Sequence, residues 1–204
     1  MKSCHAVASR AVAVLGILML SACASAPPTH YHTLLDPAAA TTASTPAPFL
    51  IDVQPVGIPA QVDRPQLVVR DGGGVMPLEQ ERWIAPLADE ARAALSADLS
   101  RELATTDVAG QPRPEGARVI IVKVDLRRFD SVAGAYIAID AVWSLSTNTP
   151  NAKALVCASA AHEAVGPGYD ELAQGHRRAL AAIASRIASA ARAYAAGQGA
   201  CPPN

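Results

Sequence analysis

The chain has 204 residues, with 17 Lys and Arg residues against 18 Asp and Glu residues, so its formal net charge is -1. This balance argues against binding of nucleic acid and against polybasic attachment to a membrane surface, since both depend on an excess of basic residues. Half of the residues are hydrophobic but only 4% are aromatic, which predicts a core built from Val, Ile, Leu and Ala.

Residues 1–22 have the pattern of a secretory signal peptide. Lys2 and Arg10 form a basic start, and the apolar run at residues 11–20 is too short for a membrane-spanning helix, which needs about 20 apolar residues. This segment holds two basic residues and no acid, so its removal leaves 15 bases (17 - 2) against 18 acids. The mature chain is therefore mildly acidic.

A lipobox ends this segment. Leu20, the small residues Ser21 and Ala22, and Cys23 match the L-[AS]-[GA]-C pattern, and Cys23 is the residue that would receive diacylglycerol and an acyl chain such as palmitate. Several acyl chains anchor a protein stably without a spanning helix. The next residue is Ala24 rather than Asp, which by the sorting rule of proteobacterial lipoproteins predicts the periplasmic face of the outer membrane. An ordinary secretory signal with a chance cysteine is the alternative.

Residues 23–48 form the lipidated N-terminus and a tether. They are rich in Ala, Thr, Ser and Pro, a composition typical of a flexible linker, with one short ordered piece expected at residues 31–35. His30 and His32 are spaced so that an extended chain could present both to a metal ion, but a solvated pair is the favoured interpretation.

The next residues predict short strands and then a helix. Alternating or continuous apolar residues indicate strands at 49–58 and 66–70, and a short returning strand is considered at 75–79 after a glycine turn. Apolar residues then recur every three or four positions at 81–103, which predicts an amphipathic helix with Pro86 in its first turn. The acidic pairs Glu79 with Glu81 and Asp89 with Glu90 are expected to be solvated on this helix or its lead-in. Residues 105–116 form a loop.

Three strands and a helix complete the predicted domain. Strands are expected at 118–129, 135–146 and 154–165, followed by a helix whose apolar stripe runs from Leu172 to Tyr194 and which stops at Gly197. The order predicts an α+β fold, a two-layer sandwich in which about five mainly antiparallel strands carry two long helices on one face. The periplasmic domain would span residues 49–197, and residues 198–204 would form a C-terminal tail.

Cys157 and Cys201 are the two cysteines left after cleavage and lipidation. An even pair in an oxidising compartment predicts a disulfide that joins the tail to a strand. Two free thiols are the alternative, and the distance between the two Cα atoms decides between them.

The sequence indicates no catalytic residues, no metal site and no cofactor beyond the lipid on Cys23. It lacks the nucleophile, phosphate-binding and zinc motifs, and His162 and Glu163 are neighbours on a strand, which sends them to opposite faces. We therefore do not expect an enzyme.

Three motifs stand out along the chain: Y-x-T-L near the N-terminus, I-P-x-x-x-D-R-P-Q-L-V-x-R around a turn between strands, and W-x-x-P-L. Their residues are Tyr31, Thr33 and Leu34; Ile58, Pro59, Asp63, Arg64, Pro65, Gln66, Leu67, Val68 and Arg70; and Trp83, Pro86 and Leu87. Together these motifs resemble the PqiC family, the auxiliary lipoproteins of ABC-type transport systems.

The resemblance implies a docking component that receives the MCE-domain subunit of a lipid transporter on the periplasmic side, as a homo-oligomer. Asp63, Arg64, Pro65 and Trp83 are the candidate contacts with this partner, although a turn or a core role would also explain them. Arg70 is expected to pair with an acid on a helix. The alternatives are a scaffold lipoprotein of a secretion or pilus system and a lipid-binding carrier with an apolar cavity.

Overall fold

The structure is a computed structural model and describes residues 27–36, 44–149 and 152–203. The cleavage site at Leu20, Ser21 and Ala22 and the lipidation site at Cys23 lie outside these residues. Within the described part of the chain, no helix is both long and apolar enough to cross a membrane.

The strands and helices follow the predicted order, with one more strand at the N-terminus. They are β1 (His30–His32), β2 (Leu50–Val53), β3 (Gln66–Asp71), β4 (Gly74–Trp83), α2 (Leu87–Leu103), β5 (Val119–Val132), β6 (Tyr136–Thr147), β7 (Leu155–Ala164) and α3 (Tyr169–Ala195). The short ordered piece expected inside the tether is thus partly a strand.

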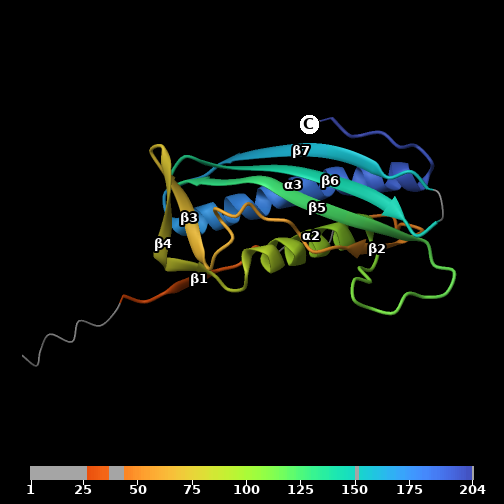
Figure 1. Cartoon of the computed structure of the whole chain (residues 1–204), viewed down its shortest axis with the longest axis horizontal. Coiled ribbons are helices and arrows are strands. Elements are labelled where there is room, and N and C mark those ends of the chain that lie inside the picture. Colours follow the sequence, from red (N-terminus) through yellow and green to blue (C-terminus); the bar gives the residue numbers. More distant parts are fainter. Residues whose placement is uncertain (1–26, 37–43, 150–151, 204) are drawn as a thin grey trace, which may run out of the picture.

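The strands form two mixed sheets beside the two helices. In the larger sheet the order is β2-β5-β6-β7, where β2 runs parallel to β5 and the other pairs are antiparallel. The smaller sheet has the order β1-β4-β3, with β1 parallel to β4, and lies at one end of the molecule (Figure 1). The predicted α+β class is confirmed, but the strands divide between two sheets instead of forming one sheet of about five.

Helix α3 packs against the larger sheet through the predicted apolar stripe. Leu172, Leu180, Ile183 and Ile187 are completely buried between this helix and the strands. Gly175 allows the closest approach, because a Cβ at this position would lie 2.5 Å from Cγ1 of Val165. His176, the next residue of the helix, consequently lies deep in the core.

The start of α2 differs from the prediction. The helix begins at Leu87, after Pro86, and not at residue 81, because Glu81 and Trp83 belong to the end of β4. Here β4 pairs with β1 on one side and β3 on the other. The two neighbouring strands supply the backbone hydrogen bonds of this segment, although its local periodicity resembles a helix.

The structure contains the disulfide between Cys157 and Cys201 that the cysteine count indicates. The two Cα atoms are 5.6 Å apart, within the range of about 4.4–6.8 Å that this bond requires. Cys157 is buried on β7, so the bond holds the C-terminal tail against this strand.

Candidate functional site

Asp63, Arg64, Pro65 and Trp83 line one groove, although Trp83 is 18 residues away from Pro65 in the sequence. The groove has a volume of about 360 Å³, and its other lining residues are Ile84, Ala85, Pro86 and Leu87. The first three groove residues precede β3, whereas the others end β4 and begin α2. The backbone N–H of Trp83 donates to the carbonyl oxygen of Pro65 at 2.9 Å, which joins the two walls.

The polar side chains of this groove are available for a partner. Asp63, Arg64 and Pro65 are exposed, and the carboxylate and guanidinium of the first two have no polar partner within the described chain. A hydrogen bond stabilises the turn before β3: the carbonyl oxygen of Pro59 accepts the N–H of Asp63 at 3.2 Å. The groove thus combines apolar lining residues with a guanidinium and a carboxylate that form no ion pair with the described residues.

Trp83 is mainly a core residue. Its side chain is buried and makes edge-to-face contacts with His32, Phe129 and His176, with ring centroids 6.2–6.4 Å apart. Removing this ring would therefore disturb four elements at once: β1, β4, β5 and α3.

The two N-terminal histidines are not a solvated pair, which corrects the interpretation from the sequence. Nδ1 of His30 donates to Oε1 of Glu81 at 2.9 Å, and Nε2 of His32 donates to Oε2 of the same carboxylate at 2.6 Å. Asp170 at the start of α3 lies 3.3 Å from Nδ1 of His32. Burial opposes ionisation of Glu81, but the hydrogen bonds from both histidines outweigh it and hold the pKa of Glu81 below 4.5.

A second buried acid, Glu90, holds the residues that follow β1. One oxygen of its carboxylate accepts both the hydroxyl of Thr33 and the backbone N–H of Leu34, each at 2.7 Å. Glu90 was expected to be solvated, but it faces this segment from the first turn of α2. The Y-x-T-L motif therefore has a structural role: its Thr and Leu fix the chain where it leaves the N-terminus.

We expect Glu81→Gln to loosen β1. Neutralising the carboxylate weakens two hydrogen bonds and should lower the free energy of unfolding by about 1–3 kcal/mol. Hydrogen exchange should also accelerate at the amide of Ile84, which donates to the carbonyl oxygen of His32. Glu79→Gln is the matched control, since Glu79 is exposed on the same strand and lies 4.0 Å from Arg82. Equal exchange in the two variants would contradict the role of Glu81.

Arg70 pairs with a strand acid and not with the predicted helix acid. Its Nε donates to Oδ1 of Asp130 on β5 at 2.9 Å, and Nε of Arg128 donates to Oδ2 at 2.6 Å. Burial opposes the charge of Asp130, but the two guanidinium groups hold its pKa below the usual value. This ion pair ties the smaller sheet to the larger one and leaves Arg70 no free role in the groove.

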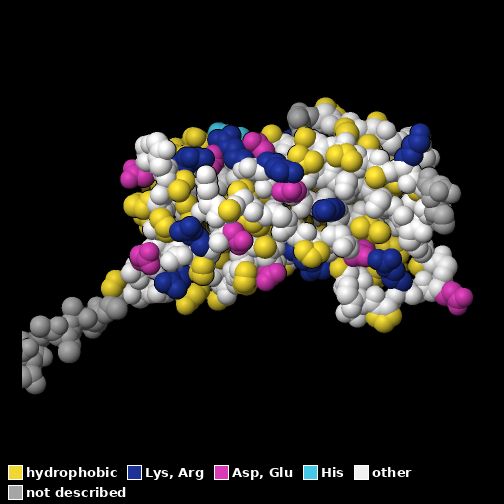
Figure 2. All heavy atoms as spheres, viewed as in Figure 1, with side chains coloured by type: hydrophobic (Ala, Val, Ile, Leu, Met, Phe, Trp, Pro, Cys, Tyr) yellow, Lys and Arg dark blue, Asp and Glu magenta, His cyan; other side chains and the backbone are white. Residues whose placement is uncertain are grey.

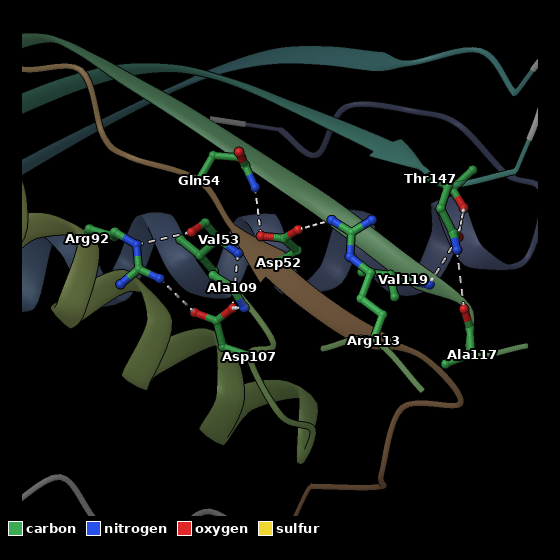
Figure 3. Close-up of polar contacts among 11 residues, drawn as sticks. Asp52, Val53, Gln54, Arg92, Asp107, Ala109, Arg113, Ala117, Val119 and Thr147 are labelled. Carbon is green, nitrogen blue, oxygen red and sulfur yellow. Dashed lines mark hydrogen bonds and ion pairs between the residues drawn. The ribbon is translucent and has the colours of Figure 1, made fainter. Parts of the chain in front are cut away.

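A polar cluster at β2, shown in Figure 3, was missed by the analysis of the sequence. Arg113 pairs with the buried carboxylate of Asp52, and NH2 of Arg92 lies 3.6 Å from Oδ2 of Asp107. Oδ1 of Asp107 also accepts the N–H of Ala109 two residues ahead, an Asx turn that the sequence could have signalled. These contacts fasten the loop after α2 to the sheet.

The closest approach to a catalytic pair is buried. Oγ of Ser131 lies 2.8 Å from Nε2 of His176, and Nδ1 of the same ring has no hydrogen-bond partner among the described residues. His176 is completely buried and stacks on Phe129, with ring centroids 3.8 Å apart. A substrate cannot reach this hydroxyl, so the pair serves packing. His162 and Glu163, on opposite faces of β7, contact Tyr136 and Arg178 respectively.

No metal site emerges from the described residues, and the groove between α2 and α3 does not suit an acyl chain. The described residues contain no cluster of three or more His, Cys, Asp or Glu side chains placed to hold a metal ion. A groove of about 530 Å³ lies between α2 and α3, but its lining includes Asp98, Arg101, Arg177 and Arg178. Charged walls of this kind do not suit an acyl chain, so this groove does not favour the carrier alternative.

Comparison with known proteins agrees with the two-layer α+β architecture. Two solved structures share the fold: an uncharacterized protein, with 20% identity and a TM-score of 0.63, over 80% of this chain and 98% of that one; and protein XCC0632 from Xanthomonas campestris, with 15% identity and a TM-score of 0.57, over 78% and 91%. No curated protein matches the chain.

The family is established by the sequence itself. The family model of the ABC-type transport auxiliary lipoprotein component matches residues 32–188, which covers most of the chain. The chain therefore belongs to this family, the PqiC-like auxiliary lipoproteins. This is a family of transport components and not of enzymes.

Proposed function

We propose that this chain is anchored through Cys23 to the periplasmic face of the outer membrane, where it docks the MCE-domain subunit of an ABC-type lipid transporter. The family match over residues 32–188 carries the proposal. A homo-oligomer that receives the end of the MCE assembly is part of the same proposal.

The groove at Arg64 supports this role. Its walls come from two of the three family motifs. The side chains of Asp63 and Arg64 form no ion pair with another described residue. An apolar floor with a charged edge is the arrangement that protein partners use, because the buried centre gives affinity and the edge gives orientation. A scaffold role in a secretion or pilus system would use the same lipid anchor but another partner.

Reversing the charge of Arg64 should weaken partner binding. In affinity purification from the native cells in detergent, we expect Arg64→Glu to reduce recovery of the MCE-domain subunit by about tenfold or more, a loss of at least about 1.4 kcal/mol. Lys123→Glu is the matched control, because Lys123 is exposed on β5, outside the groove.

Two results would contradict the proposal. If Arg64→Glu and Lys123→Glu retained the transporter subunit equally, the groove would not be the contact. If the wild-type protein brought down secretion or pilus components without a transporter, the scaffold role would replace docking.

A further inference from the structure

We propose that the outer face of the three-stranded sheet contacts the phospholipid bilayer to which the chain is anchored. This inference rests on the proposed lipidation of Cys23 and adds a second attachment, made by the folded domain itself. The face is defined by Tyr31 on β1, Arg82 on β4 and Ile84 just after β4.

Exposed apolar side chains gather at this end of the molecule. Four of the large hydrophobic residues that are exposed in the described chain lie on the three-stranded sheet or directly after it: Tyr31, Val75, Met76 and Ile84. The others are Leu35 after β1, Tyr169 at the start of α3 and Val156 on β7. Figure 2 shows hydrophobic side chains among charged ones over the end where β3 and β4 lie. Clustering of this kind marks an interaction surface, while single exposed residues do not.

The strand register puts the outer-face residues on one side. Tyr31 pairs with Arg82, and Ile84 follows two residues later, so alternation along the strands directs all three side chains away from the core. The intervening residues His32 and Trp83 point the other way and are buried. Tyr31 and Ile84 are 61% and 59% exposed, which leaves both side chains in solvent.

The lipid anchor cannot be far from this face. His30 is seven positions after Cys23, and a fully extended chain of seven residues spans at most about 25 Å. Since Glu81 and Glu90 hold the residues of β1 and those after it, this end of the domain is the end nearest the bilayer. Figure 1 shows β1 at the same end as β3 and β4.

The chemistry of the face suits the interface of a bilayer. Tyrosine is enriched at the boundary between headgroups and acyl chains, and an isoleucine gains by entering the apolar layer. Arg82 on this face can meet a lipid phosphate, but Glu79 lies 4.0 Å from it and offsets much of the attraction. Burial of apolar surface is therefore the main driving force, which agrees with the mildly acidic mature chain. Ile84 also lines one side of the groove, so a partner seated there would lie next to the bilayer contact.

Spin labels can measure the contact in the full lipid-anchored protein. The mature chain has no free thiol once Cys23 is acylated and Cys157 is bonded to Cys201, so a single introduced cysteine takes one nitroxide. Ile84→Cys and the control Val156→Cys would be labelled and reconstituted into vesicles of phosphatidylethanolamine and phosphatidylglycerol. Relaxation by oxygen, which dissolves in the bilayer, is then compared with relaxation by a water-soluble nickel chelate.

The expected result is an oxygen-to-nickel accessibility ratio several-fold higher for the label at position 84 than for the label at 156. Equal, water-like ratios at both positions would overturn the membrane contact. If the label at 84 were shielded only after the MCE-domain subunit was added, the face would be a protein-docking surface, so the membrane contact would fail while the proposed function stood. If mass spectrometry found no acyl chains on Cys23, both the proposed function and the membrane contact would be contradicted.

Discussion

Acidification from pH 7 to pH 5 should destabilise the protein by about 2 kcal/mol through one residue, His176. Complete burial disfavours the charged imidazolium and lowers the pKa of His176 from 6.5 to about 3. Between these two values the unfolded chain binds a proton that the folded chain does not, so stability is full above pH 6.5 and falls as the pH drops. The slope is about 1.4 kcal/mol per pH unit, and the total loss approaches about 5 kcal/mol near pH 3.

His176→Gln tests this assignment. Glutamine keeps a polar group near Ser131 but does not titrate, so the variant should lose the slope between pH 6.5 and pH 4.5 whatever its stability at pH 7. Urea denaturation at a series of pH values measures the effect. The window avoids Asp130, whose depressed pKa adds a loss of stability only at lower pH. Parallel pH profiles for variant and wild type would show that His176 is not the buried titrating group.

Loss of the disulfide should cost about 4 kcal/mol. The bond between Cys157 and Cys201 closes a loop with a sequence separation of 44, and the loop-entropy relation gives this value for the constraint on the unfolded chain. The double variant Cys157→Ala/Cys201→Ala removes the bond without leaving a buried thiol. Its free energy of unfolding should therefore fall by nearly the full amount.

Denaturation in urea, with and without a reducing agent, measures this contribution. Reduction should lower the stability of the wild type toward that of the double variant and leave the variant unchanged. The single variant Cys201→Ser is the control for side-chain packing, since Cys201 is exposed and only the lost bond should matter. A loss below about 1 kcal/mol would mean that the tail is already ordered in the unfolded reference, contrary to the entropy argument.

The spacing of apolar residues was sufficient to predict a helix or strand that packs against one layer of the fold. The stripe from Leu172 to Tyr194 indicated α3 because one side of that helix meets the sheet. The alternation in β5 and β6 likewise indicated strands whose two faces differ in burial. In these segments the spacing of apolar residues along the sequence directly reports which face of the helix or strand is buried.

Long-range pairing explains what the sequence did not reveal. Glu81 looked like a solvated acid on a helix, yet it lies on a strand because β1, about 50 positions earlier in the chain, pairs with it and supplies His30 and His32. The partner of Arg70 was missed for the same reason, since Asp130 comes from the other sheet. No local period encodes such contacts.

The groove was partly predictable. Family motifs named Asp63, Arg64, Pro65 and Trp83, and the structure brings these four residues together. Local sequence did not show that Trp83 faces the aromatic core, or that Ile84 beside it is exposed. Trp83 is buried and Ile84 exposed because β4 extends to Trp83, and this end of β4 depends on its pairing with β1.

Site-specific photocrosslinking in the native cells tests the docking claim most directly. A photoreactive amino acid would replace Arg64 in the groove or, as a control, Lys123 on β5, and the adducts would be identified by mass spectrometry. The account predicts an adduct with the MCE-domain subunit from position 64 and none from position 123. An adduct at position 64 with a secretion or pilus component, in the absence of any transporter subunit, would contradict it.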